Sequence, residues 1–291
     1  MLTDKHKADH MAFVRQFLRE GATGKPYSHD MFDQVHIDEK WFYISKINRP
    51  YYLWNDETVP SRKCQSKSHT MKKKAMWNGK IGMWPFVAKR PALRNSKHRK
   101  RGDEITESLT VMRDVYRVYL AEKVIPAIRE TWPSGRGGTI WIQQDNSRPY
   151  VSVNDPAVAA AGCVDGWNIR LYAQPVQGPN LNMLDLGFFN AIHSLQHQTV
   201  TYTFDDLLVA GKQAFQGPES RVLDKTFMTF QKVMECIFKM DGDNAFKLPH
   251  QGKDVIALRA PLVFDLHAMT RFVQSLIPWR NEWSLNAALI L

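Results

Sequence analysis

The sequence has few cysteines and no long apolar run, and each absence excludes a class of protein. Its three cysteines, Cys64, Cys163 and Cys236, are widely spaced and form no Cys-x-x-Cys pair. This argues against a disulfide scaffold or a zinc site and fits a reducing compartment. No segment approaches the roughly 20 apolar residues that a membrane-spanning helix needs, and the N-terminus has no apolar core for a signal peptide. We therefore expect no membrane partner.

Acidic residues are missing from one long stretch of an otherwise basic chain. The protein has 39 Lys or Arg against 29 Asp or Glu, a net charge of +10, which favours a polyanionic partner. Residues 58–102 hold 14 of the cations and no acid. Because cations without counter-charges repel one another, we interpret this segment as a phosphate-binding region that projects from loops. The alternative is an ordinary solvated face.

Apolar periodicity predicts an α/β protein. We expect strands at residues 35–44, 49–54, 80–88, 139–145 and 169–174. We expect helices at residues 4–20, 109–131, 155–161, 185–198, 204–216 and 219–240, with a kink at Pro126. Strands dominate the first half and helices the second, which is typical of an α/β domain with a mixed sheet and a helical C-terminal part.

Three aspartates occupy positions where a charge needs compensation. Asp38 lies within an apolar strand and Asp145 closes another, so each loses solvation unless a partner is near. Asp185 stands at the start of a predicted helix, where the dipole suits an anion. Carboxylates at adjacent strand ends form an oxygen-rich pocket for a hard divalent cation. Taken singly, Asp185 also fits a helix N-cap and Asp145 a turn, so these alternatives stay open.

Three blocks around these aspartates resemble the signature motifs of mariner-superfamily transposases. The blocks are His36-Ile37-Asp38-Glu39-Lys40-Trp41-Phe42, Gln144-Asp145-Asn146-Ser147-Arg148-Pro149 and Leu181-Asn182-Met183-Leu184-Asp185-Leu186-Gly187-Phe188-Phe189. They stand in the family's order, and the 39 residues between Asp145 and Asp185 resemble its plant-type branch. The resemblance covers about residues 2–253, although Tyr150 stands where family members usually carry His.

The resemblance implies a ribonuclease H-like fold, with a central mixed five-stranded sheet flanked by helices. It implies that Asp38, Asp145 and Asp185 are the catalytic residues and hold two Mg²⁺ ions, for which Mn²⁺ can substitute. The implied enzyme is a metal-dependent DNA nuclease and strand transferase. It hydrolyses a phosphodiester at transposon ends and joins the freed 3′-hydroxyl to target DNA, in the nucleus and as a homodimer.

DNA contacts are expected from the basic residues Lys72, Lys73, Lys74, Lys97, Arg99, Lys100, Arg101 and Arg148. The runs at 72–74 and 97–101 are equally compatible with nuclear import. Arg148 is equally compatible with an ion pair to a surface acid.

We expect residues 1–30 to form a helical lead-in, residues 31–253 the catalytic domain, and residues 254–291 a divergent, poorly packed tail. Family members carry helix-turn-helix modules ahead of this domain. We find no counterpart, so sequence-specific end recognition should be absent while phosphate contacts remain. Two alternatives stay open: a catalytically inactive, transposase-derived nucleic-acid-binding relic, and an unrelated ribonuclease H-like nuclease.

Overall fold

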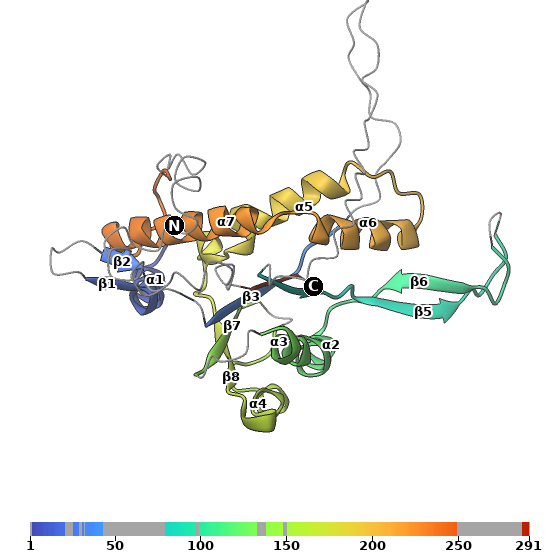
Figure 1. Ribbon diagram of the computed structural model, residues 1–291, viewed down its shortest axis with the longest axis horizontal. Coiled ribbons are helices and arrows are strands. Elements are labelled where there is room, and N and C mark those ends of the chain that lie inside the picture. Colours follow the sequence, from blue (N-terminus) through green and yellow to red (C-terminus); the bar gives the residue numbers. More distant parts are fainter. Residues whose placement is uncertain are drawn as a thin grey trace, which may run out of the picture.

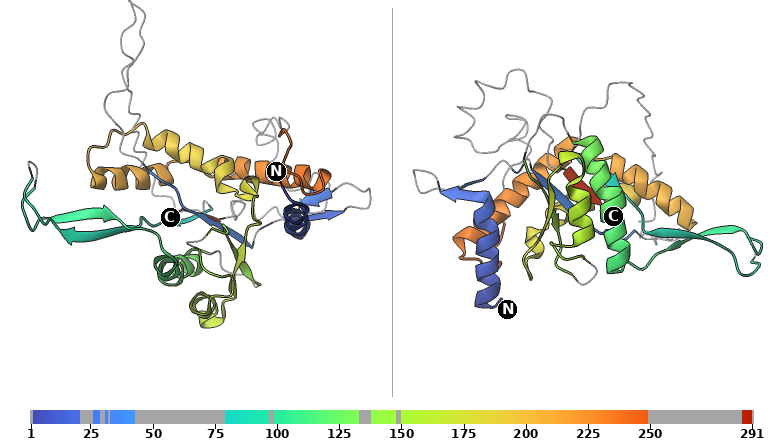
Figure 2. Two further views of the ribbon diagram at one scale, coloured as in Figure 1. Left: turned by 180° about the vertical axis from the view of Figure 1, so that it is seen from behind. Right: turned by 90° about the horizontal axis from the view of Figure 1, so that it is seen from below.

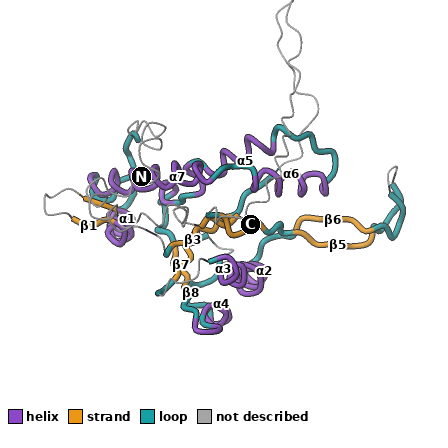
Figure 3. The backbone as a smooth tube through the Cα atoms, in the orientation of Figure 1, coloured by secondary structure: helices purple, strands orange, loops and turns teal. Residues whose placement is uncertain are grey.

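The computed structural model describes residues 2–20, 26–28, 31, 33–42, 79–96, 99–132, 138–147, 150–248 and 287–290. A five-stranded sheet crosses the middle of the molecule, and helices lie on both of its faces (Figure 1). The tube view in Figure 3 shows the same order of layers, with strands between two groups of helices. The expected mixture of helices and strands is confirmed.

The central sheet contains parallel pairings only, among the described strands. Its order is β4-β9-β3-β7-β8, formed by β4 (Lys80–Met83), β9 (Ala287–Ile290), β3 (Gln34–Asp38), β7 (Ile140–Gln144) and β8 (Ile169–Ala173). The expectation of a mixed central sheet is therefore wrong for these strands, because β9 enters between β3 and β4 and runs parallel to both. The strand expected at 49–54 lies outside the described residues.

β9 lies in the C-terminal segment that was expected to be a poorly packed tail. Of residues 254–291, the structure describes only this strand, which pairs with two neighbours in the sheet. The end of the segment is therefore part of the sheet, whereas the expectation of poor packing for residues 254–286 falls outside the described part of the chain.

The strand expected at 80–88 is two separate strands. β4 lies at the edge of the sheet, not at its centre, and ends at Met83. Pro85 has no N–H to donate to a strand ladder, and its carbonyl instead accepts the N–H of Val87 at 3.1 Å. The chain then forms an antiparallel hairpin of β5 (Val87–Pro91) and β6 (Glu104–Ser108), which projects away from the body of the molecule (Figures 1 and 2).

Alternation along the strands builds one core on each face of the sheet. Val35 and Ile37 of β3 join Ile142 of β7 and Leu171 of β8 in a core beneath the helices α2 (Arg113–Tyr119), α3 (Ile125–Thr131) and α4 (Pro156–Gly162). His36 points the other way. It is fully buried and meets Phe227 and Phe230 edge-on at 5.6 and 5.5 Å between ring centroids.

The second core gathers the remaining helices on the His36 face. It joins side chains from α1 (Asp4–Phe17), α5 (Phe188–Gln196), α6 (Phe204–Gln216) and α7 (Ser220–Lys239). His10 of α1 contacts the carbonyl oxygens of Val176 and Gly242 at 3.1 and 2.9 Å. Gly242 lies so close to α1 that a Cβ there would meet the Lys7 carbonyl at 2.1 Å. α1 is thereby fixed against the helical C-terminal part.

The helix expected at 109–131 begins at Arg113 and changes its winding partway along. A π turn, Leu120–Val124, connects α2 to α3, and the N–H of Ile125 donates to the carbonyl of Leu120. Pro126 follows at once. Its ring would clash with the carbonyl four residues back in regular α-helix, and a wider turn relieves that contact. The structure therefore has a π turn directly before the position at which the sequence predicts a kink.

α6 has the predicted bounds, and α7 is one residue shorter at each end because Glu219 and Met240 are its caps. α1 ends at Phe17, before the expected residue 20, because Leu18 is extended and begins β1 (Leu18–Glu20), which pairs with β2 (Pro26–Ser28). No helix among the described residues has the length and apolar character to cross a bilayer.

Candidate active site

Asp38 and Asp145 lie at the same edge of the central sheet. Asp38 is the last residue of β3 and Asp145 directly follows β7. These parallel strands pair through His36 and Gln143, so two further residues along each strand lead to Asp38 and Asp145. The carboxyl ends of strands are where open α/β sheets place their binding sites.

Asp185 joins this edge from a turn. It lies in the 3-10 turn Leu184–Leu186, which is separated from α5 by Gly187. Asp185 is therefore neither the N-cap nor the first residue of a long helix, and its expected position at a helix start is wrong. The backbone of Gly187 is not helical, so the turn and α5 do not merge.

One amide group links Asp38 to Asp185. The Nδ2 of Asn182 donates to Oδ2 of Asp38 at 2.6 Å and to Oδ2 of Asp185 at 3.1 Å. The Oδ1 of Asn182 accepts the backbone N–H of Leu184 at 3.1 Å. Because this last bond ties the amide to the turn that carries Asp185, Asn182 holds the turn against the end of β3.

Asp145 combines a turn role with proximity to the other acids. Its carboxylate accepts the backbone N–H of Asn146 at 2.6 Å and the hydroxyl of Ser147, which is the turn chemistry that the sequence left open. Burial is the main cause of the raised pKa of Glu39 and of Asp185, and the charge of Asp145 adds to both. All three predicted aspartates therefore act on one electrostatic site.

A fourth carboxylate and a tyrosine complete the group. The hydroxyl of Tyr150 lies 3.1 Å from Oδ1 of Asp38 and 2.7 Å from Oε2 of Glu39. It can donate to either carboxylate. Tyr150 is buried and packs edge-on against Tyr116, with ring centroids 4.7 Å apart. Tyr150, which stands where members of the family that the sequence resembles usually carry His, therefore contacts the first predicted aspartate.

The acids are held in an environment that disfavours their charge. Burial raises the pKa of Asp38 to about 6. The hydrogen bond from Asn182 lowers this pKa, and the charge of Asp185 raises it. Burial also raises the pKa of Glu39 to about 7. Desolvation raises the pKa of Asp185, which lies at the exposed rim, while Lys40 lowers it. Acids crowded in this way are frequent at functional sites, and a bound cation would offset their repulsion.

The donor types fit a hard divalent cation. Oε1 of Glu39 is buried and, within the described residues, has no hydrogen-bond partner, a costly state for a carboxylate oxygen. Carboxylate oxygens are the ligands that Mg²⁺ prefers. In the part of the chain that the structure describes, no three His, Cys, Asp or Glu side chains are already gathered as a metal-holding group. Side-chain rotation would have to bring these acids around one ion.

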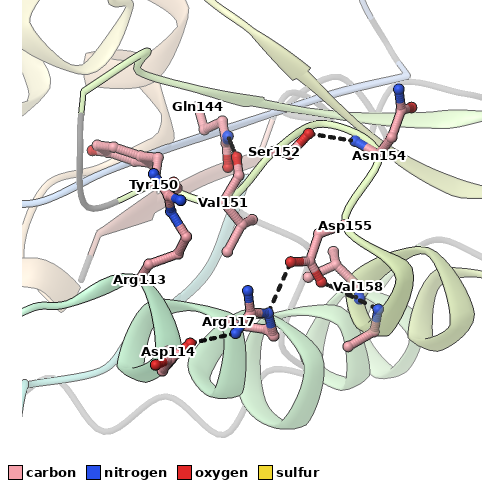
Figure 4. Close-up of polar contacts among 11 residues, drawn as sticks. Arg113, Asp114, Arg117, Gln144, Tyr150, Val151, Ser152, Asn154, Asp155 and Val158 are labelled. Atoms are coloured by element: carbon pink, nitrogen blue, oxygen red, sulfur yellow. Dashed lines mark hydrogen bonds and ion pairs between the residues drawn. The ribbon is translucent and has the colours of Figure 1, made fainter.

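The chain after Asp145 is held in place by α2 (Figure 4). Nε of Arg113 donates to the carbonyl of Tyr150 at 3.2 Å, and Nε of Arg117 donates to Asp155 at 2.8 Å. Asp155 in turn caps α4 through the N–H groups of Ala157 and Val158. These contacts hold the backbone at Tyr150 and five residues after it, at Asp155, and so help to position the Tyr150 hydroxyl.

The predicted DNA-binding residues are only partly described. Lys72, Lys73, Lys74, Lys97 and Arg148 lie outside the described residues. Arg99, Lys100 and Arg101 are exposed in the turn that joins β5 to β6, so these three cations project from a loop as expected, at the far end of a hairpin.

The assumption that residues 58–102 lack counter-charges is wrong for two of the 14 cations, and a third, Lys80, is bonded to backbone carbonyls. Lys89 pairs with Glu104 and Arg90 with Glu107, because β6 brings acids from beyond the segment back beside β5. Lys80 is buried, and its ammonium donates to the carbonyls of Phe215, Gln216 and Pro218 at the end of α6. These three residues are structural.

Sequence reasoning missed Asn182, Glu39 and Tyr150 as parts of the site. Each lies in or beside a block that surrounds an aspartate, which is the only signal that pointed to them. Nothing in the order of residues shows that Asn182 reaches Asp38, 144 positions away.

Comparison with known proteins adds no assignment. No protein-family model matches the chain, and no curated protein matches it significantly.

Proposed function

We propose that this chain is the catalytic domain of a mariner-like transposase with a ribonuclease H-like fold. It would hydrolyse phosphodiesters at transposon ends and transfer the resulting 3′-hydroxyl to target DNA. The observation that carries the proposal is the electrostatic and hydrogen-bonded grouping of Asp38, Asp145 and Asp185 at one edge of a parallel sheet. The resemblance of the three surrounding blocks supplies the choice of reaction.

Mg²⁺ or Mn²⁺, when bound, would supply the Lewis acidity that activates water and stabilises the oxygens of an in-line displacement. Asp38, Asp145 and Asp185 would hold the cations. Asn182 orients two of these carboxylates, and Tyr150 orients the oxygen of Asp38 that Asn182 does not touch. No covalent enzyme intermediate is required, so no nucleophilic side chain is assigned.

The test is the joining of pre-cut DNA ends to a plasmid in the presence of Mg²⁺ or Mn²⁺. We expect the purified chain to produce joined or nicked product, and Asp38→Ala and Asp145→Asn each to reduce it by a factor of 10³ or more, on the order of an essential catalytic interaction. Asp9→Asn, an exposed change on α1, is the matched control and should retain full activity.

Two results would contradict the proposal. Activity that persists in both triad variants would place the reaction elsewhere. A wild-type chain that binds DNA without cleaving or joining it, with either metal, would instead identify an inactive nucleic-acid-binding relic. Mn²⁺ binding can be measured from the paramagnetic signal of the free ion. This measurement distinguishes an inactive chain that does not bind the metal from one that binds it but does not catalyse the reaction.

A further inference from the structure

The β5–β6 hairpin is an arm that leaves the body of the molecule. The two antiparallel strands project from the body side by side, and the turn that joins them lies at the far end (Figures 1 and 2). Midway along the arm, the hydroxyl of Thr106 in β6 donates to Asp205 at the start of α6 at 2.7 Å, and this bond ties the arm to that helix. We call residues 87–96 and 99–108 the arm, and residues 92–96 and 99–103 its tip.

The shaft of the arm is electrically balanced. Its two basic residues on β5, Lys89 and Arg90, form ion pairs with Glu104 and Glu107 on β6. Exposed pairs of this kind stabilise a hairpin only modestly. Their effect on the surface field is larger, because they remove net charge from the shaft.

The tip is strongly cationic. Five Lys or Arg and one acid, Asp103, occur in residues 92–103. The described cations are fully at the surface, and none forms an ion pair within the described residues; they are Arg94, Arg99, Lys100 and Arg101. Arg99 only contributes electrostatically, by helping Arg90 to lower the pKa of Glu107.

The backbone of the tip is organised by its own hydrogen bonds. Asp103 accepts the N–H of Lys100 at 2.6 Å, and Asn95 accepts the N–H of Arg101 at 2.6 Å. The N–H of Ala92 donates to the carbonyl of Asp103 at 2.8 Å, and the N–H of Gly102 donates to the carbonyl of Ala92 at 2.9 Å, which closes the turn. The single acid is thus occupied with the backbone, and the cations are presented on a folded platform.

We propose that the arm tip binds the phosphate backbone of duplex DNA at a distance from the aspartate site. The inference rests on the proposed function for its choice of DNA among polyanions. A neutral shaft with unpaired cations at its end concentrates positive potential at one place. Contacts to phosphates would fix the DNA without reading its sequence.

The test compares duplex binding by three forms of the full chain, measured by fluorescence anisotropy over a range of salt concentrations in EDTA. The tip variant changes Arg94, Arg99, Lys100 and Arg101 to Gln. Each lost phosphate contact lowers the log–log salt slope by ~0.9. We therefore expect the tip variant to lose about two to four units of slope and to bind at least tenfold more weakly.

The matched control removes the same net charge from the opposite end of the molecule. It changes Lys5, Arg15, Lys239 and Lys247 to Gln, all exposed near α1 and the end of α7. The proposal requires this variant to keep a slope within about one unit of the wild-type value. Equal losses in both variants, or an unchanged slope in the tip variant, would overturn it.

Competition identifies the class of partner, and EDTA separates this test from the test of catalysis. Displacement of the duplex by polyglutamate at equal charge concentration would show that the tip prefers an acidic protein, against the proposal. Because no divalent metal is present, a tip effect can stand even where metal-dependent joining fails. If the wild-type chain joins DNA ends and the tip variant binds duplex DNA like wild type, the proposed function stands and only the proposal for the arm is overturned.

Discussion

Asn182 is the residue on which the arrangement of the candidate site depends. It places one amide between Asp38 and Asp185, while its oxygen is held by the backbone of the same turn. An amide can neither repel these carboxylates nor neutralise them, so it fixes their positions and leaves their charge available for a cation. Groups that orient metal ligands without binding the metal often set the affinity of a site.

Replacement of Asn182 by Ala should weaken Mn²⁺ binding about 10- to 100-fold, since that is the usual cost of losing an orienting contact. Titration of the paramagnetic signal of free Mn²⁺ gives the affinity directly, without an activity assay. Asn180→Ala, in the neighbouring 3-10 turn Pro179–Leu181, is the control and should bind Mn²⁺ like wild type. Equal affinity in both variants would show that Asn182 is not an orienting residue.

At the scale of elements, Lys80 connects the edge of the sheet to a helix end. Its ammonium reaches the last carbonyl groups of α6, at 2.9 Å for Phe215 and 3.1 Å for Gln216. Carbonyls at a helix C-terminus lack intrahelical partners and carry partial negative charge. Burial lowers the pKa of Lys80 to about 8, which leaves it charged at neutral pH. Lys80 belongs to the basic segment that we interpreted as phosphate-binding, but in the structure it caps the C-terminus of α6.

Lys80→Met should lower the free energy of unfolding by about 2 kcal/mol at pH 7, because buried carbonyls lose a charged donor. Urea denaturation followed by circular dichroism measures the change. Lys89→Met removes an exposed ion pair on the arm and is expected to cost less than about 1 kcal/mol. A Lys80→Met chain as stable as Lys89→Met would rule out the capping role.

For the whole molecule, buried acids couple stability to pH. Burial raises the pKa of Asp38 to about 6 and the pKa values of Glu39 and Asp224 to about 7. In the unfolded chain such acids titrate near pH 4. Between about pH 4 and 7 the folded protein therefore holds more protons, and the free energy of unfolding falls as pH rises through that window.

Asp224 allows this effect to be separated from the metal site, because it lies on α7 and not at the sheet edge. Asp224→Asn should raise the free energy of unfolding by roughly 1–2 kcal/mol at pH 8 and leave it unchanged at pH 4, where the carboxyl is neutral. Urea denaturation in EDTA at both pH values tests this. Asp9→Asn is the exposed control, and identical pH profiles for the two variants would refute the assignment.

The α/β class, most helices and four of the five described strands of the central sheet were predictable from the sequence, since apolar periodicity depends on near neighbours in the chain. The sequence also located Asp145 at a strand end, whereas Asp38, which was expected within a strand at 35–44, is the last residue of β3. α6 and α7 were predicted almost to the residue, because Gly217 and Pro218 interrupt a strong helical pattern between them.

Which distant residues meet depends on the packing of the elements and could not be predicted from local patterns. Asn182 reaches Asp38, Tyr150 reaches Glu39, β9 enters the sheet from the C-terminal segment, and Glu104 and Glu107 neutralise cations that composition left unpaired. Local patterns report the preference of a residue for helix, strand or turn. Hydrogen bonds and ion pairs depend on which elements pack together, and that is fixed by the burial of two apolar faces around one sheet.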